Sequence, residues 1–130
     1  MQTENATPDR PSRDSRPHRR LISADRVQGS PVFDREGHKV GHVEDVMLDK
    51  VSGHVAYAIM SHGGFLGAAE HYYPIPWRML SYDIDRAGYV VPLDKAQLES
   101  APALDKVQID DDEEWTQTVH NHYGMPAPFI

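Results

Sequence analysis

Glycines, histidines and acidic residues are the side chains of this sequence that could build a chemical site. Three glycines, Gly63, Gly64 and Gly67, cluster in the stretch SHGGFLGAAEHYYPIPW. A phosphate-binding loop needs such glycines followed by a helix, usually with a lysine for the phosphates. This stretch lacks the lysine and continues into a proline-rich segment. We therefore predict a structural loop, whose glycines adopt backbone angles closed to other residues, and no cofactor site.

The histidines and acidic pairs do not have the spacing of a metal site or a catalytic site. His120 and His122 would lie on different faces of a helix, and we expect the histidines at the surface. A weak metal affinity of this pair together with the acidic residues 110–114 remains an alternative. Glu44 and Asp45 are adjacent on an expected strand, where neighbouring side chains point to opposite faces, so they form no acid/base pair. We predict no catalytic residue, no metal ligand and no enzyme.

The composition excludes several classes of function. The chain has 13 Lys and Arg residues and 20 Asp and Glu residues, and its formal net charge of -7 argues against binding nucleic acid through the phosphates. It has no cysteine, which excludes a disulfide, a thiolate metal site and a cysteine nucleophile. No window has the roughly 18 apolar residues of a membrane helix, and the N-terminus lacks the apolar region of a secretory signal. We expect a cytoplasmic protein with no membrane span and no direct contact with nucleic acid.

Residues 1–20 differ in composition from the rest of the chain. They hold three prolines, five arginines and only two apolar residues. Such a segment buries too little apolar surface to offset the entropy of ordering, so we expect a disordered basic arm. We expect residues 21–102 to form one folded domain. Residues 103–130 are predicted to hold an acidic linker, a short helix and a proline-containing tail.

Turn signals divide residues 21–93 into short strands. DREG, DKVSG and DIDRAG, at residues 34–37, 49–53 and 83–88, each place an Asp ahead of a Gly that can adopt positive φ. The runs between them are rich in β-branched and aromatic residues, which predicts a small antiparallel barrel or sandwich. In the run KVGHVEDVMLD the apolar spacing is nearly helical. Its glycines and valines favour a strand with a bulge near Glu44 and Asp45.

The run VAYAIM, residues 55–60, is apolar on both of its expected faces. A strand covered only on its inner side would alternate, so either a C-terminal segment or a second subunit should cover the outer face. If a second subunit covers this face, the protein is a dimer, so this run is the sequence feature that favours dimerisation.

The C-terminal third carries helix signals. Asp94 is a candidate N-cap for the short helical run DKAQLES, which ends before a proline. In DDDEEWTQTVHNHYG, Trp115, Val119 and His122 share one helical face, and Gly124 is placed to stop the helix. This pattern predicts a short amphipathic helix.

Five motifs together resemble the PRC-barrel domain family over about residues 21–102. They are G-x-x-V-x-x-x-x-G-x-x-V-G-x-V-E-D-V-M-L-D at 29–49, G-x-V-A-Y-A at 53–58, GGFLG at 63–67, YPIPW at 73–77 and Y-x-V-P-L-D at 89–94. The fold is shared by the cytoplasmic part of the photosynthetic reaction centre H subunit and the C-terminal domain of the ribosome maturation factor. The resemblance implies a six-stranded antiparallel β-barrel that serves as an interaction module, commonly self-associating, with no catalytic apparatus known for the fold. The ribosomal role is only a fold-level analogy.

These observations predict an all-β, non-enzymatic interaction or assembly module that forms a homodimer and needs no cofactor. An unidentified protein partner is possible. The alternatives are an adaptor in ribosome maturation or RNA processing and a stress protein that binds a metal or a small ligand. The candidate interaction residues are Phe65, Leu66, Tyr57 and Trp77.

Overall fold

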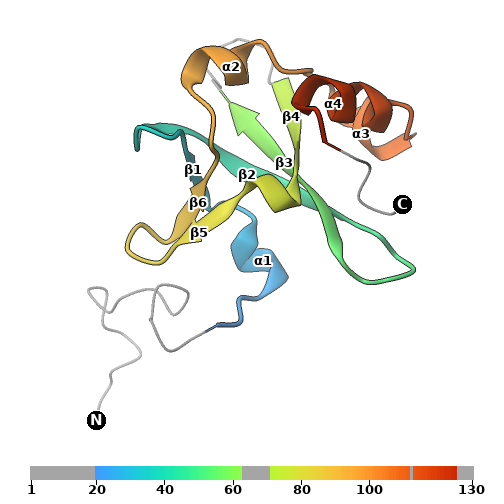
Figure 1. Ribbon diagram of the computed structural model, residues 1–130. Coiled ribbons are helices and arrows are strands. Elements are labelled where there is room, and N and C mark those ends of the chain that lie inside the picture. Colours follow the sequence, from blue (N-terminus) through green and yellow to red (C-terminus); the bar gives the residue numbers. More distant parts are fainter. Residues whose placement is uncertain (1–19, 63–70, 112, 126–130) are drawn as a thin grey trace.

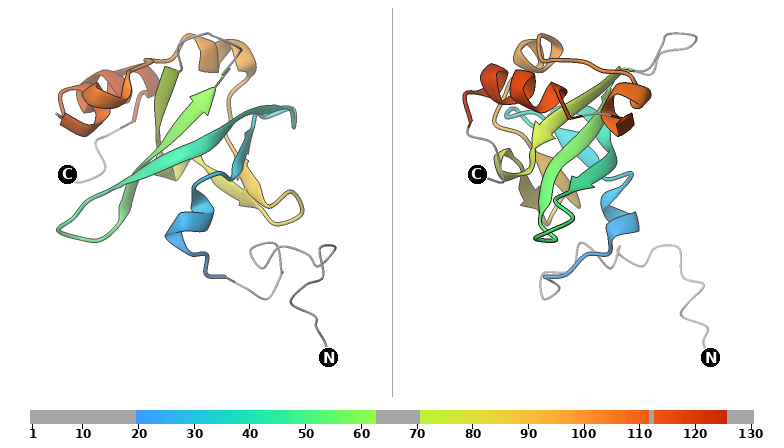
Figure 2. Two further views of the ribbon diagram at one scale, coloured as in Figure 1. Left: turned by 180° about the vertical axis from the view of Figure 1, so that it is seen from behind. Right: turned by 90° about the vertical axis from the view of Figure 1, so that its right-hand side faces the viewer.

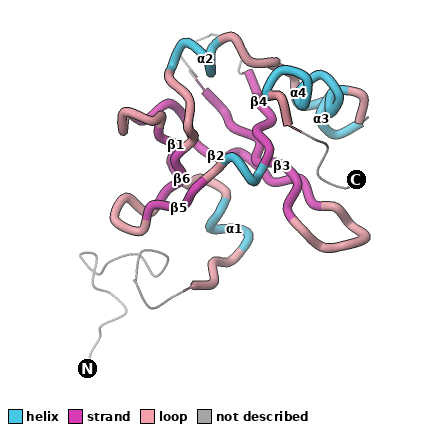
Figure 3. The backbone as a smooth tube through the Cα atoms, viewed as in Figure 1, coloured by secondary structure: helices cyan, strands magenta, loops and turns pink. Residues whose placement is uncertain are grey.

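A single six-stranded sheet runs through the computed structural model, which describes residues 20–62, 71–111 and 113–125 (Figure 1). Neighbouring strands follow the order β4-β3-β2-β1-β6-β5. Short helices precede, interrupt and follow the strands (Figure 3). The strands are β1 (Pro31–Phe33), β2 (Lys39–Leu48), β3 (Val55–His62), β4 (His71–Pro76), β5 (Ser81–Asp83) and β6 (Gly88–Val90). The helices are α1 (Ala24–Val27), the 3-10 helix η3 (Trp77–Met79), α2 (Lys95–Glu99), α3 (Lys106–Asp111) and α4 (Trp115–Tyr123).

One strand pairing corrects the predicted antiparallel barrel. Strands β1 and β6 run parallel, with Val32 opposite Tyr89, whereas the other four neighbouring pairs are antiparallel. The turn signals predict hairpins between consecutive strands, but β1 and β6 are far apart in the chain, so no local signal sets their relative direction. Over the described residues, no pairing between β4 and β5 closes the sheet into a barrel. The fold is a mixed, mostly antiparallel sheet with short helices.

Two bulges in β2 explain why its apolar residues have nearly helical spacing. The pairing of β2 with β1 skips one residue at Val40, and its pairing with β3 skips one at Glu44. Each skipped residue shifts the alternation of faces by one position. Val40, Val43 and Val46, which are three residues apart, consequently all pack into the same core. The predicted bulge near Glu44 and Asp45 is confirmed.

Strand β3 separates two hydrophobic cores, as its two-sided apolar sequence predicts. Helices α3 and α4 cover its outer face (Figure 2), so the chain's own C-terminal segment supplies the expected cover. The inner core contains Val27, Val32, Val40, Val43, Ala58, Met60, Tyr73, Ile75, Tyr89, Val91, Leu98 and Ala101. The outer core contains Ala56, Tyr57, Ile59, Ile109, Trp115 and Val119.

Two of the three predicted turns form as their sequences indicate. Gly37 and Gly53 adopt φ values of 90° and 82°. In the third turn the positive φ of 52° falls on Ala87 instead of Gly88. Gly88 is needed for space, because a Cβ there would lie 2.6 Å from the carbonyl oxygen of Pro31. The parallel contact of β6 with β1 therefore depends on this glycine.

Strand β4, at one edge of the sheet, accommodates two prolines. Tyr72 directs its amide and its carbonyl outward, where both bond the backbone of Leu104. Alternate residues of a strand direct these groups to the same side, so Pro74 and Pro76 also face outward. Proline has no amide hydrogen, and an outward position on an edge strand is where this lack costs no ladder bond. The outer edge of β4 therefore has no donor at these two positions.

The helix signals near the C-terminus are confirmed at two residues. The Asp94 carboxylate accepts the Gln97 backbone N–H at 2.8 Å, and the Gln97 side chain accepts the Asp94 backbone N–H at 2.9 Å. Gly124 ends α4 with a φ of 66°. The sequence does not predict α1 or α3, and α3 lies within the stretch expected to be an acidic linker. No helix in the described ranges is long and apolar enough to cross a membrane.

Candidate functional site

The GGFLG segment lies outside the described residues, and so do five of the predicted site residues. Their predicted roles, a structural loop and an interaction surface, therefore stay predictions. The residues concerned are Gly63, Gly64, Phe65, Leu66 and Gly67.

The two other predicted interaction residues pack inside the chain. Tyr57 is only 2% exposed and lies in the outer core beneath α4. Trp77 is partly buried on η3, where it packs against the inner core with its ring centroid 5.3 Å from that of Tyr89. Neither side chain is as exposed as Leu48 or Val51, whose exposures are 57% and 92%.

A buried histidine corrects the expectation that the histidines lie at the surface. His120 is 5% exposed, whereas His122, which the helical pattern placed on the buried face, is exposed. The Met125 carbonyl can only accept a hydrogen bond, so Nδ1 of His120 donates to it at 3.1 Å. Nε2 then accepts the hydroxyl proton of Tyr57. Both ring nitrogens are engaged in hydrogen bonds. His120 therefore has no free lone pair for the weak metal site that the sequence allows for His120 and His122.

The outer core also buries two polar atoms without a hydrogen-bond partner among the described residues. They are Nε1 of Trp115 and the hydroxyl of Tyr123. The Trp115 ring meets the Tyr57 ring edge to face, with centroids 4.9 Å apart. An unpaired buried donor costs about 1–3 kcal/mol, so α4 is held by apolar burial against a polar penalty.

Burial of two tyrosines makes this packing sensitive to alkaline pH. Burial is the main cause, and the charge of Glu113 the smaller one, that raises the pKa of Tyr57 to about 12. Burial is also the main cause, with a smaller effect of Tyr73, that raises the pKa of Tyr123 to about 12. In the unfolded chain these phenols ionise near pH 10. Their contribution to stability is therefore complete below pH 10 and is lost as the pH rises towards 12.

We expect the free energy of unfolding to fall between pH 10 and 12 by up to about 1.4 kcal/mol per pH unit for each of the two tyrosines. Urea unfolding followed by circular dichroism at pH 8, 10 and 11 measures this slope. Tyr123→Phe is the control, because it removes an unpaired hydroxyl and should reduce the slope without loss of stability at pH 8. An unchanged slope in this variant would contradict the assignment.

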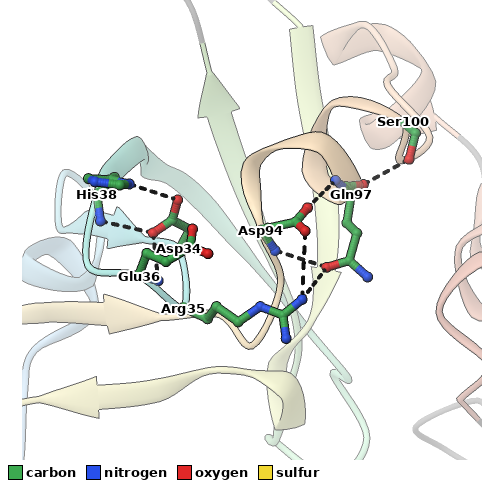
Figure 4. Close-up of polar contacts among 7 residues, drawn as sticks. All are labelled: Asp34, Arg35, Glu36, His38, Asp94, Gln97 and Ser100. Carbon is green, nitrogen blue, oxygen red and sulfur yellow. Dashed lines mark hydrogen bonds and ion pairs between the residues drawn. The ribbon is translucent and has the colours of Figure 1, made fainter.

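Asp34, Glu36 and His38 form a group of three ligand-type side chains among the described residues, with ligand atoms within 4.8 Å of one another (Figure 4). Asp34, 1% exposed, accepts the backbone N–H groups of Glu36 and His38, each at 2.9 Å. Burial acts to raise the pKa of Asp34, but these bonds and the His38 ring outweigh it and lower the pKa. The Asp34 carboxylate thus closes the β1–β2 turn.

The same turn is tied to the start of α2. The Arg35 backbone N–H donates to the Leu93 carbonyl at 3.0 Å. Its guanidinium lies 3.2 Å from the Gln97 side-chain oxygen and 3.7 Å from the Asp94 carboxylate (Figure 4). All of these contacts join one structural element to another, so the arrangement is best explained as a support for the turn.

An exposed apolar surface lies elsewhere, at the β2–β3 hairpin. Leu48 and Val51 are 57% and 92% exposed and border a hollow of about 540 Å³. A smaller hollow of about 60 Å³ shares Leu48 and Glu113 with it. We call the two together the hairpin groove. Its lining residues are Met47, Leu48, Asp49, Lys50, Val51, Ala56, Tyr57, Glu113, Trp115 and Thr116.

Hydrogen bonds within the turn hold the Asp49 carboxylate of the groove in its ionised form. The backbone N–H of Val51 and the hydroxyl of Ser52 donate to the Asp49 carboxylate at 3.1 Å and 3.0 Å. These bonds, the first of them most, lower the pKa of Asp49, so its carboxylate is ionised at neutral pH. Our sequence reasoning missed this surface, although a valine inside the polar turn DKVSG was a signal that could have found it.

A PRC-barrel domain model matches residues 20–98 of the sequence. The chain belongs to the PRC-barrel domain family. Part of this PRC-barrel protein is similar to a solved structure of a proposed 16S ribosomal RNA processing protein, RimM, from Pseudomonas aeruginosa. The two are 18% identical, with a TM-score of 0.37, over 58% of this chain and 45% of that chain, so this chain matches less than half of the other's length. No curated protein matches the sequence.

The hairpin groove lies at the border of the PRC-barrel match. Leu48 and Val51 fall inside the matched residues, whereas Glu113 and Trp115 follow them in the chain. Glu113 and the first residues of α4 therefore complete a surface that the PRC-barrel part begins.

Proposed function

We propose that this PRC-barrel protein is a non-enzymatic interaction module that associates with a second copy of itself through the hairpin groove. The observation that carries the proposal is the exposure of Leu48 and Val51, which both line the larger hollow of the groove, while Leu48 also lines the smaller hollow with Met47 and Trp115. Contiguous exposed apolar side chains mark interaction sites in soluble proteins. Burial of one large aliphatic side chain contributes about 1.5–3 kcal/mol before the entropy of association is subtracted.

The titratable groups support a binding role over a catalytic one. The lowered pKa values of Asp34 and Asp49 arise within their own turns, and the raised pKa values of Tyr57 and Tyr123 arise from burial in the cores. A catalytic site needs such groups to converge on one accessible pocket. In the described residues they serve the fold instead.

Replacing Leu48 and Val51 together with serine is expected to weaken self-association by about a hundredfold, roughly tenfold for each lost aliphatic contact. Sedimentation velocity from micromolar to millimolar concentration measures the change. Val107→Ser is the matched control, because Val107 is 65% exposed on α3 and does not line the groove. A wild-type protein that is monomeric over this whole range would refute the proposal, and so would an equal effect of Val107→Ser.

A further inference from the structure

Resting on the proposed self-association, we propose that Arg20 and Leu21 of one copy occupy the hairpin groove of the other, and that the contact is reciprocal. The groove itself defines the chemistry of its occupant. Its walls combine exposed Leu48 and Val51 with the carboxylates of Asp49 and Glu113, against the single ammonium of Lys50. In the sequence, Glu113 belongs to a run of five acidic residues at 110–114. An aliphatic side chain flanked by arginine fits this combination of apolar and negative surface.

The chain presents one segment of this kind among its described residues. Large hydrophobic side chains exposed outside the groove are Leu21, Ile84 and Val107. Ile84 lies between Asp83 and Asp85, which acidic walls would repel. Val107 follows Lys106, whose ammonium already pairs with carboxylates at 3.4 Å and 3.9 Å. Leu21 is 80% exposed and directly follows Arg19 and Arg20 in the sequence.

The arrangement of the two surfaces favours a second copy as the partner. Leu21 is 80% exposed, so it does not fill the groove of its own chain, and the proposed contact is made with another molecule. The start of α1 and the β2–β3 hairpin both lie at the lower end of the molecule in all three views (Figures 1 and 2). Two copies that face each other through these ends can form both contacts in one two-fold interface. Such reciprocity gives a closed dimer.

Charge reversal tests the contact directly. Arg20→Glu and Glu113→Arg are each expected to weaken self-association about tenfold or more, because each places like charges together at both halves of the interface. In an equimolar mixture, the carboxylate introduced by Arg20→Glu in one chain meets the guanidinium introduced by Glu113→Arg in the other, while the second contact keeps its native charges. The mixture should therefore regain wild-type association, and native mass spectrometry should show the heterodimer in excess over both homodimers.

Two further variants separate this contact from a general effect of charge. Lys95→Glu makes the same charge change as Arg20→Glu on α2, at the opposite end of the molecule, and should leave association unchanged (Figure 1). Leu21→Ser should weaken association without a change of charge. A wild-type dimer that tolerates both reversals, or a mixture that fails to recover, overturns the proposed contact and leaves self-association standing. A monomeric wild type overturns both.

Discussion

Replacing Trp115 with alanine is expected to lower the free energy of unfolding by about 3–5 kcal/mol. The indole is 7% exposed and packs in the outer core against Tyr57, on the face of β3 that α3 and α4 cover. Its removal leaves a cavity between α4 and the sheet, and the short helices have little stability of their own without packing. We expect the loss to appear first as detachment of α3 and α4.

Urea unfolding followed by circular dichroism measures the loss, and amide hydrogen exchange shows whether α4 and the outer face of β3 open first. Trp115→Phe is the matched control, because it keeps an aromatic ring and removes the Nε1 donor that has no partner among the described residues. It should cost less than about 1.5 kcal/mol, since relief of the unpaired donor offsets part of the lost packing. A loss below about 1.5 kcal/mol in Trp115→Ala would show that the indole does not hold α4 in place, and a loss in Trp115→Phe as large as in Trp115→Ala would contradict the dominant role of ring packing.

Replacing Gly41 with alanine is expected to destabilise the sheet by about 1–3 kcal/mol or more. A Cβ at this position would lie 2.3 Å from the carbonyl oxygen of Ser61 and 3.1 Å from Cγ of Met60. The side chain of Met60 can move, but the carbonyl belongs to the backbone of β3. The strain can therefore be relieved only if β2 and β3 separate locally.

Thermal or urea unfolding of Gly41→Ala measures the loss in the free energy of unfolding. Nuclear magnetic resonance can show whether the structural change is confined to β2 and β3. Gly124→Ala serves as the comparison, because a Cβ there would meet nothing within 4 Å and only its φ of 66° is strained. We expect Gly124→Ala to cost about 1 kcal/mol and to affect the end of α4 alone. A Gly41→Ala protein as stable as the wild type would contradict the close approach of the two strands.

Local features of the fold could be predicted from the sequence because local chemistry determines them. Asp34 and Asp49 cap their own turns, Asp94 caps α2, and the glycines that end the first two turns adopt positive φ. The bulge near Glu44 was predictable, because glycines and valines favour a strand while the apolar spacing departs from strict alternation. These outcomes need no knowledge of distant parts of the chain.

Features that depend on contacts between distant segments could not be predicted in the same way. The parallel pairing of β1 with β6 and the positive φ of Ala87 follow from where the strands meet. The burial of His120 instead of His122 depends on Tyr57, 63 residues earlier in the chain, which supplies the hydroxyl that its ring accepts. The hairpin groove forms only when the segment after the PRC-barrel match folds back beside β2 and β3.

The two prolines on the outer edge of β4 make this edge of the sheet a poor site for strand addition. A strand without amide hydrogens at Pro74 and Pro76 is a poor template for an incoming strand, so fibril-like growth is hindered on that side even in a concentrated solution. An association of the kind proposed above would then depend on side-chain contacts, because strand addition at this edge lacks two of its backbone donors.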